Sequence, residues 1–490
     1  MDLQPLTPSR VRYGGFFLTP RDASNNCPSN PPPPQPPNVC EAAGVCLDCD
    51  GAFHGTMVTG VAAGNAATGK RDFNPGNVGY FLGTGIAPTA GILSTKIENS
   101  AGRQWLARTI LDFAPDATSR SVYIQNHSHN EYNVTPSATG MYTLQSQLFD
   151  RAVRDSDGAG IQLSPITLTV SAGNLSQDSN QLLLLPPATS KNVIAVGGAE
   201  DVRDPSEWRF CAGVTHSDAN SFRNIMADSK HGTLVQAGGH GWDTYAKPDL
   251  YAPASQIVST RATDLSPQIP TGFDCIGYGG SAPDYDPDYF IDSGTSFAAP
   301  VAAGAALIAS RVYAASLGGT PNPAAASPAL LKAMLVASAR SMRTALDKTI
   351  DPSVAITARP NAVQGFGRLS LVDIVSHSPA RQYVDQSPSR TFTASGQKWS
   401  ATYPVSDTSR PVKVVLVWTD APAPAPSGNV PTLIQNDLDL LVSIGDSTNR
   451  KTYAGNNLIE STQSADEGEE SQLYVVELLA IPIQRTTSKP

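Results

Sequence analysis

The stretch "DSGTSFAAPVAAGAALIA", residues 292–309, places a serine between a turn and a long run of small apolar residues. Gly294 permits a tight turn, and the alanine-rich run predicts a helix that packs deep inside a protein. Ser296 would then lie beside free backbone N–H groups at the positive end of the helix dipole. Pro300 is expected near the first helical turn, where its missing N–H removes no hydrogen bond. An ordinary N-cap serine has the same features, so Ser296 needs partners before it can be interpreted as a nucleophile.

Two other stretches supply candidate partners. His54, in "FHGTMVTGVAAGN" (53–65), begins another predicted helix of small residues, and a histidine can be the general base that a serine hydroxyl requires. Asn174 follows the strand-like run "TVSAG" (169–173), at the carboxyl end of a predicted parallel strand, where functional groups gather. Its amide can donate to an oxyanion. Each residue alone also suits a cap or a turn, so only their combination indicates a catalytic site.

Length, composition and net charge restrict the class of protein that this chain can be. The chain has 490 residues, 40% of them hydrophobic and 16% charged, and a net charge of −9. This length favours two or more domains, and the scattered lysines and arginines argue against a nucleic-acid-binding face. No apolar run is expected to approach the roughly 20 residues of a membrane span. The first residues, "MDLQPLTPSR" (1–10), lack the apolar segment of a signal peptide.

Apolar runs and helical patterns alternate from about 54 to 375, which predicts an α/β fold with a parallel sheet covered by helices on both faces. Strand-like runs lie at 90–97, 121–128, 166–173 and 192–199, and helical patterns lie at 142–154, 297–316 and 327–340. After Pro379 strand-like runs follow one another without a helix between them, so an all-β module is expected from about 380.

Four of the six cysteines lie between Cys27 and Cys49, around the proline-rich run "NPPPPQPPN" (30–38). Cys46 and Cys49 have the C-x-x-C spacing of zinc sites, but no second ligand pair accompanies them. Disulfides that staple a proline-rich loop are the favoured interpretation, with zinc as the alternative. An even number of cysteines is consistent with an oxidising compartment.

Five motifs occur in the order and spacing of the subtilisin-like serine proteases, and the chain resembles that family over residues 51–375. They are "HGTMVTGVAAG", "GIAPTAGI" (85–92), "TVSAGN", "AKPDLYAP" (246–253) and "DSGTSFAAPVAAG". Further on, "VKVVLVWTDAPA" (412–423) and "LIQNDLDLLVS" (433–443) resemble the C-terminal β-sandwich of one subtilase branch.

This resemblance implies two domains. Residues 1–380 would form a peptidase domain with a seven-stranded, subtilisin-like parallel sheet flanked by helices, interrupted by an insertion at about 22–50. Residues 381–490 would form an all-β, jelly-roll-like sandwich, expected to be incomplete. The resemblance also implies that no cofactor is required for catalysis, that the partners are protein or peptide substrates, and that the protein is a secreted or extracytoplasmic monomer.

The same resemblance assigns the site. It implies Ser296 as nucleophile, His54 as general base, and Asn174 as oxyanion donor together with the Ser296 N–H. It places Ser128, in "IQNHSHN", and Gly173 beside the substrate. Subtilases often bind calcium, and Asn436, Asp437 and Asp439 are candidate ligands, although an exposed strand accounts for them equally well.

One family feature has no match. The third member of the subtilase triad is an aspartate in a D-[ST]-G turn before the histidine, and none of the upstream aspartates (Asp2, Asp22, Asp48, Asp50) has that context. The first core strand and its aspartate are therefore expected upstream of Met1. A non-catalytic binding protein on a subtilase scaffold is the alternative that this gap favours. An α/β-hydrolase esterase is excluded, because it needs G-x-S-x-G and a serine that precedes the histidine.

Overall fold

The fold is taken from a computed structural model, and every structural statement below concerns the residues that it describes. These are 11–13, 54–65, 83–94, 122–130, 139–155, 165–175, 182–202, 221–233, 246–260, 289–318, 326–342, 346, 361–376, 381–387, 390, 392–404, 412–424, 433–444 and 450–454. The six cysteines and the expected insertion at about 22–50 lie outside them, so the disulfide and zinc interpretations stay predictions.

A four-stranded parallel sheet forms the centre, in the order β3 (Ile124–His127), β4 (Thr167–Ser171), β5 (Ile194–Ala199) and β8 (Leu250–Pro253). Every residue of β4 and β5 is buried. Strands that are buried on both faces show continuous apolar runs instead of alternation, which is the pattern that predicted this sheet. The parallel α/β core is confirmed.

Four shorter ladders complete the strands. β1 (Val11–Tyr13) pairs in parallel with β2 (Ile92–Ser94), and three antiparallel ladders join β6 (Gly232–Thr233) to β7 (Ala246–Lys247), β9 (Ile257–Thr260) to β10 (Tyr289–Asp292) and β11 (Leu441–Ile444) to β12 (Lys451–Ala454). The described residues thus hold six parallel strands in two separate sheets, and the seven-stranded sheet stays a prediction. After residue 380 their only ladder of named strands is β11–β12, so the β-sandwich also stays a prediction.

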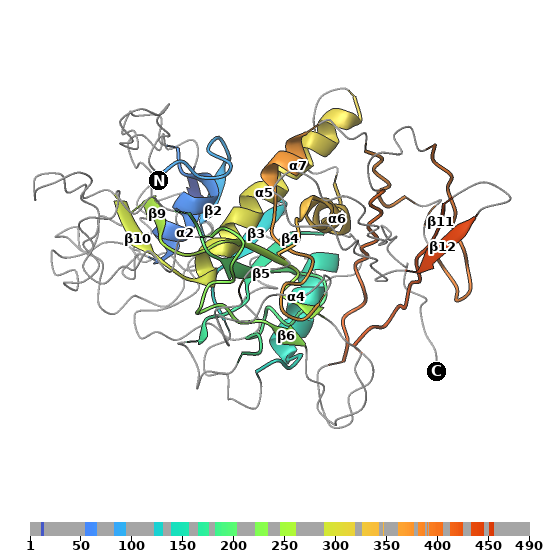
Figure 1. Cartoon of the computed structure of the whole chain (residues 1–490), viewed down its shortest axis with the longest axis horizontal. Helices are drawn as coiled ribbons and strands as arrows, with labels where there is room; N and C mark the ends of the chain where they lie inside the picture. The colour runs from blue at the N-terminus through green and yellow to red at the C-terminus, as the bar shows by residue number, and fades with distance from the viewer. Residues whose placement is uncertain are drawn as a thin grey trace, which may run out of the picture.

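Helices cover both faces of the central sheet (Figure 1). They are α2 (His54–Ala63), α4 (Leu144–Arg154), α5 (Thr295–Ser316), α6 (Pro328–Ser338) and α7 (Leu371–Val375). Ile194 and Val196 of β5 belong to one core cluster with α2, α5, α6 and α7. Ala195, which points the opposite way, belongs to a second cluster with α4. The alternation of side chains along one strand therefore builds two cores.

The long helix α5 passes through the larger core. Its small residues permit close packing, since a Cβ on Gly304 would lie 2.6 Å from the Cβ of Ile86 and 3.1 Å from the carbonyl oxygen of Ala62. At 22 residues α5 is long and apolar enough to cross a bilayer, which corrects the expectation that no apolar run approaches that length. However, 78% of its most apolar window is buried inside the protein. A core helix of this kind is weak support for a membrane span.

A segment beyond residue 380 is bound tightly to the core. The Lys191 side chain is 1% exposed, and its Nζ donates to Asp420 Oδ2 (2.5 Å) and to the carbonyl oxygens of Ala421 (2.7 Å) and Leu433 (2.6 Å). All three acceptors lie more than 220 residues further along the chain. A buried ammonium group is tolerated only when it is paired, and this segment supplies three acceptors for Lys191.

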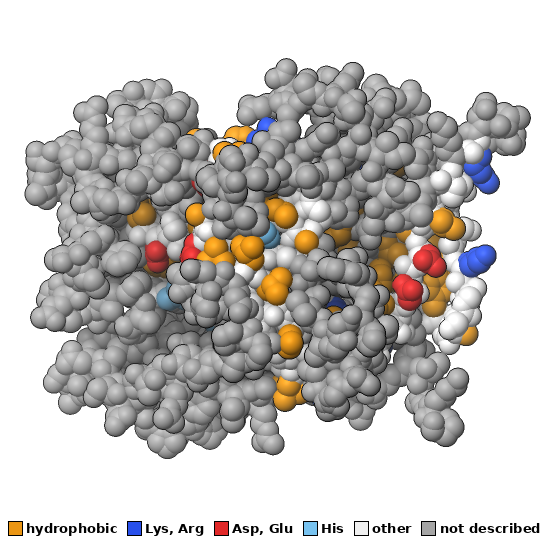
Figure 2. Space-filling view, turned by 60° about the horizontal axis from the view of Figure 1, so that its bottom comes forward, with side chains coloured by type: hydrophobic (Ala, Val, Ile, Leu, Met, Phe, Trp, Pro, Cys, Tyr) orange, Lys and Arg blue, Asp and Glu red, His pale blue; other side chains and the backbone are white. Residues whose placement is uncertain are grey.

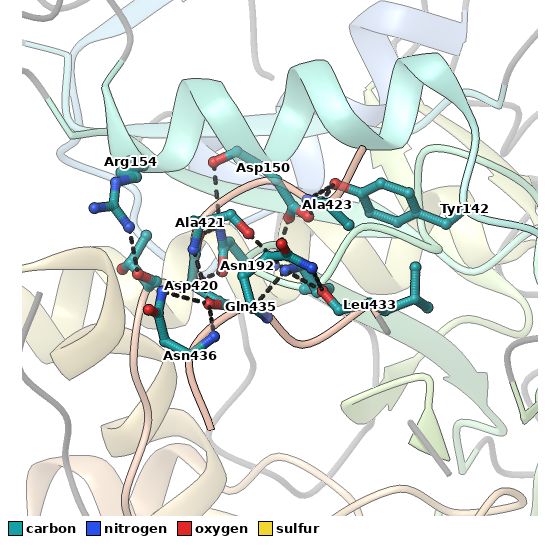
Figure 3. A network of polar contacts seen from close by, with 12 residues as sticks. Tyr142, Asp150, Arg154, Asn192, Asp420, Ala421, Ala423, Leu433, Gln435 and Asn436 are labelled. Carbon is teal, nitrogen blue, oxygen red and sulfur yellow. Dashed lines mark hydrogen bonds and ion pairs between the residues drawn. The ribbon is translucent and has the colours of Figure 1, made fainter. Parts of the chain in front are cut away.

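Asn192 extends the same contact (Figure 3). Its side chain exchanges two hydrogen bonds of 2.9 Å with the backbone of Asp420, and its N–H donates to Asp150 Oδ1 at 2.7 Å. The Tyr142 hydroxyl donates to the other Asp150 oxygen at 2.7 Å. Burial raises the pKa of Asp150, and the charge of Lys191 opposes that rise. We call Tyr142, Asp150, Lys191, Asn192 and Asp420 the polar clamp.

Candidate active site

Ser296 is the second residue of α5 and is half-buried, and Asn174 reaches the same helix end from the sheet. A Cβ on Gly294, the N-cap residue, would lie 3.2 Å from Asn174 Nδ2. Glycine at this position therefore allows the amide nitrogen to approach the start of the helix. Asn174 lies three residues beyond the end of β4, as the predicted sheet edge required.

Thr295 fixes the direction of the Asn174 amide. Asn174 Oδ1 accepts from the Thr295 N–H at 3.0 Å and from the Thr295 hydroxyl at 2.8 Å. The same hydroxyl accepts from the N–H of Gly173 at 3.1 Å. Because the carbonyl end of the amide is bound by Thr295, its nitrogen is turned toward Gly294 and can act as a donor there. Thr295 is not among the predicted site residues, since a threonine before the serine carries no signal by itself.

His54 begins α2, which packs against α5. Its ring centroid lies 6.2 Å from that of Phe297, the residue after Ser296. The first turn of α2 is fixed to β9, where the hydroxyls of Ser259 and Thr260 donate to the carbonyl oxygens of Met57 (2.7 Å) and Thr56 (3.0 Å). His54 and Ser296 thus occupy the first turns of two packed helices, as the motif order predicted.

Two titratable groups respond to the charge of His54. Burial raises the pKa of Asp292, while the N–H of Ser293 and the charge of His54 oppose that rise. Burial lowers the pKa of His129 to about 4, and the charge of His54 adds to this effect. Asp292 and His129 were not predicted as site residues. The only signal for Asp292 is its place four residues before Ser296.

Ser128 and Ser296 exchange hydrogen bonds. The Ser128 hydroxyl donates to the carbonyl oxygen of Ser296 at 2.6 Å, and the Ser296 hydroxyl donates to the carbonyl oxygen of Ser128 at 3.3 Å. Gly173 uses its N–H for Thr295, and its carbonyl accepts from the N–H of Lys230 at 3.0 Å. The N–H of Gly173 is therefore committed within the protein. A role for Gly173 in substrate binding would have to use its carbonyl or its Cα.

The expected place of Pro300 is wrong. The predicted helix began at residue 297, but α5 begins at Thr295, which makes Pro300 its sixth residue. A normal residue there would donate its N–H to the carbonyl of Ser296, four residues earlier. Proline therefore removes a real intrahelical bond from the candidate nucleophile.

The structure provides less information about the remaining predicted site residues. Asp2, Asp22, Asp48 and Asp50 lie outside the described residues. Asn436, a candidate calcium ligand, donates both its N–H and its side-chain amide to Asp420 Oδ1, each at 2.9 Å. Among the described residues no three His, Cys, Asp or Glu side chains gather into a metal-binding group. Calcium binding stays a prediction.

Comparison with known proteins decides the family. The Subtilase family (Peptidase_S8) matches residues 48–367, which is most of the chain and includes His54, Asn174 and Ser296. The chain belongs to the subtilase family. Subtilases are serine-type peptidases, and the match ends before Asp420.

The individual proteins compared below are 25% identical or less to this subtilase. It is 25% identical over 262 residues to serine protease AprX of Bacillus subtilis (strain 168), a match that covers 52% of this chain and 48% of AprX. The chain thus matches about half the length of that relative. Among solved structures, fervidolysin from Fervidobacterium pennivorans has a TM-score of 0.39 at 20% identity, over 66% of this chain and 36% of its own. A cold adapted subtilisin-like serine proteinase has a TM-score of 0.35 at 18% identity, over 70% and 78%. Both scores are below 0.5, so membership rests on the family match.

Proposed function

We propose that this subtilase is a serine endopeptidase that cleaves peptide bonds through an acyl-enzyme. The observation that carries the proposal is the convergence of Asn174 on the N-terminus of α5, where Thr295 orients its amide and Gly294 admits it beside Ser296. An amide donor and a helix N-terminus next to a serine hydroxyl form the arrangement that stabilises a developing oxyanion.

The residues then have defined tasks. Ser296 Oγ attacks the carbonyl carbon of the peptide bond while His54 accepts the hydroxyl proton. The negative oxygen of the tetrahedral intermediate accepts hydrogen bonds from Asn174 Nδ2 and from the N–H of Ser296. His54 returns the proton to the leaving amine as the C–N bond breaks. Water then attacks the ester while His54 accepts its proton, and His54 gives that proton to Ser296 Oγ as the C–O bond breaks and the acid leaves.

The second candidate is a non-catalytic protein that binds peptides on the same scaffold. It is favoured by one observation, the lack of a D-[ST]-G motif before His54. Without an aspartate to orient the histidine, a triad of this type loses about 10⁴-fold in kcat and keeps some catalysis.

A fluorophosphonate probe separates the two candidates. The endopeptidase proposal expects labelling of the full chain and none of Ser296→Ala, with both proteins showing the same far-UV circular dichroism. A folded chain that is not labelled but binds peptides would support the second candidate. Labelling that persists in Ser296→Ala would refute Ser296 as the nucleophile.

We further propose that the substrates are proteins or peptides, that the enzyme is monomeric, and that it acts outside the cytoplasm. On the face shown in Figure 2, lysine and arginine side chains of the described residues are few and scattered, which favours peptide over nucleic-acid partners. The chemistry uses only side chains and backbone and needs no cofactor. Structural calcium at Asn436, Asp437 and Asp439 would appear as a lower melting temperature in the presence of a chelator.

A further inference from the structure

The helix that carries the candidate nucleophile lacks one hydrogen bond. Pro300 has no N–H, so no residue of α5 donates from position 300 to the carbonyl of Ser296. A proline ring also crowds the carbonyl four residues earlier, which here is that of Ser296. That carbonyl therefore needs a donor from outside the helix.

Ser128 supplies the missing donor. Its hydroxyl lies 2.6 Å from the carbonyl oxygen of Ser296, although the two residues are 168 positions apart. The donor comes from the residue that directly follows β3, which is part of the central sheet. The first turn of α5 is therefore fastened to the sheet at the point where its own hydrogen bonding fails.

The direction of this bond is fixed by its neighbours. Thr169 of β4 donates its hydroxyl to Asn126 Oδ1 at 3.1 Å, and Asn126 Nδ2 donates to the Ser128 hydroxyl oxygen at 2.9 Å. Since Ser128 Oγ already accepts from an N–H, its own proton is available for the carbonyl of Ser296. A relay of three hydrogen bonds thus runs from β4 through β3 to α5.

The return contact is weaker. The Ser296 hydroxyl donates to the carbonyl oxygen of Ser128 at 3.3 Å, beyond the usual range for an O–H donor. The backbone of Ser296 is therefore held by a short bond, while its hydroxyl is held by a long one. A nucleophile needs this combination, because its backbone N–H must stay in place while its proton leaves.

From this geometry we propose that Ser128 is a positioning residue that replaces the N–H missing at Pro300 and so fixes the Ser296 backbone. The proposal rests on the proposed function, in which Ser296 attacks the substrate. Small displacements of a reacting group reduce rates strongly, by about 10²-fold for 1 Å. The role differs from lining the substrate cleft, because it acts through the Ser296 carbonyl and not through a contact with substrate.

A double-mutant cycle in the full chain tests it, with Ser128→Ala, Pro300→Ala and the combined variant. Alanine at 300 has an N–H that can reach the Ser296 carbonyl, so it makes the Ser128 hydroxyl redundant. We expect Ser128→Ala alone to lower kcat for a peptide substrate by about 10- to 100-fold with KM within about twofold. In the Pro300→Ala background the same change should cost less than about threefold.

Ser310→Ala is the matched control, because Ser310 is on the same helix and its hydroxyl bonds only the carbonyl of Leu307 in the preceding turn (2.7 Å). It should leave kcat unchanged. An equal loss in both backgrounds would overturn the proposal, since Ser128 would then act independently of Pro300. So would a normal kcat in Ser128→Ala, or a change confined to KM.

Denaturant midpoints of the four proteins in the cycle (the parent chain, Ser128→Ala, Pro300→Ala and the combined variant) test the proposal without measuring catalysis. We expect Ser128→Ala to lower the denaturant midpoint of the parent chain, which has Pro300, and to change the midpoint of the Pro300→Ala variant little. If the parent chain is folded but unreactive toward the fluorophosphonate, the proposed function fails by itself. The midpoint cycle then decides whether Ser128 replaces the missing N–H, and additive midpoints would refute that replacement.

Discussion

Thr295 holds both the oxygen of the Asn174 amide, with two hydrogen bonds of 3.0 and 2.8 Å, and the N–H of the preceding residue, Gly173, at 3.1 Å. A residue one position before the candidate nucleophile thereby sets the direction of the candidate oxyanion donor. Thr295 thus joins the start of α5 to the edge of the sheet at Gly173 and Asn174.

This alignment predicts graded losses of activity. Asn174→Ala should lower kcat by about 10²–10³-fold with little change in KM, because it removes a donor to the oxyanion. Thr295→Val keeps the shape but loses the hydroxyl bonds, and it should lower kcat by about tenfold. Thr295→Ser, which retains the hydroxyl, should stay close to the parent enzyme. Steady-state kinetics with one peptide substrate distinguish these cases, and a fully active Thr295→Val would contradict the role given to the hydroxyl.

Two histidines beside the site, His127 (buried) and His129 (partly buried), predict that stability falls in mild acid. The pKa of His129 is lowered from 6.5 to about 4, and burial lowers that of His127 well below its usual value. Between pH 6.5 and about 4 the unfolded chain therefore binds protons that the folded chain rejects. The free energy of unfolding should decrease as the pH falls through this window, by up to about tenfold in the folding equilibrium constant per pH unit for each histidine.

Urea midpoints measured from pH 7 to pH 4 check this slope. His127→Asn removes one titrating ring and should flatten the dependence. The buried carboxyl of Asp150 has a raised pKa and contributes the opposite slope, because its folded form retains a proton more readily. Midpoints that do not change between pH 6.5 and 4 would refute the assignment of neutral imidazole rings in the folded chain.

Close packing of α5 against Ile86 and against the carbonyl of Ala62 in α2 predicts that a single methyl group at Gly304 is harmful. Its Cβ would lie 2.6 Å from that of Ile86, so Gly304→Ala should destabilise the fold by about 1–3 kcal/mol. Since His54 and Ser296 begin these two helices, kcat should fall as well. Adding Ile86→Gly should recover part of kcat by removing the clash. If Gly304→Ala left the melting temperature unchanged, the contact of α5 with Ile86 and Ala62 would have to be looser than the structure shows.

The polar clamp predicts that breaking a buried ion pair lowers the free energy of unfolding much more than breaking an exposed ion pair. Asp420→Asn leaves the buried ammonium of Lys191 without its carboxylate and should cost about 3–5 kcal/mol of unfolding free energy. Arg340 and Asp373 form a 2.6 Å pair whose side chains are 46% and 37% exposed, and Arg340→Gln should cost less than about 1 kcal/mol. Guanidinium denaturation of the two variants measures the difference. Similar costs would indicate that Lys191 finds other partners in the variant.

The features that could be predicted from the sequence are those encoded by short local patterns. The buried strands and the helices beginning near His54 and Ser296 were expected from apolar runs and small residues, and Asn174 from the end of a strand. Thr295, the Ser128 contact and the clamp were not expected, because each depends on partners 121, 168 or 229 residues apart. The misplacement of Pro300 has a local cause, since the helix begins two residues earlier than its apolar run.

The clamp also orders events during synthesis. Lys191 is translated 229 residues before Asp420, and at about 5–20 residues per second the amine waits roughly 10–50 s on the ribosome for its carboxylate. Throughout that interval the Lys191 ammonium lacks the Asp420 carboxylate, which is its buried ion-pair partner in the folded protein. Lys191 lies three residues before β5, the strand that pairs with β4, so the sheet that supports Asn174 should reach its final packing only after Asp420 has left the exit tunnel.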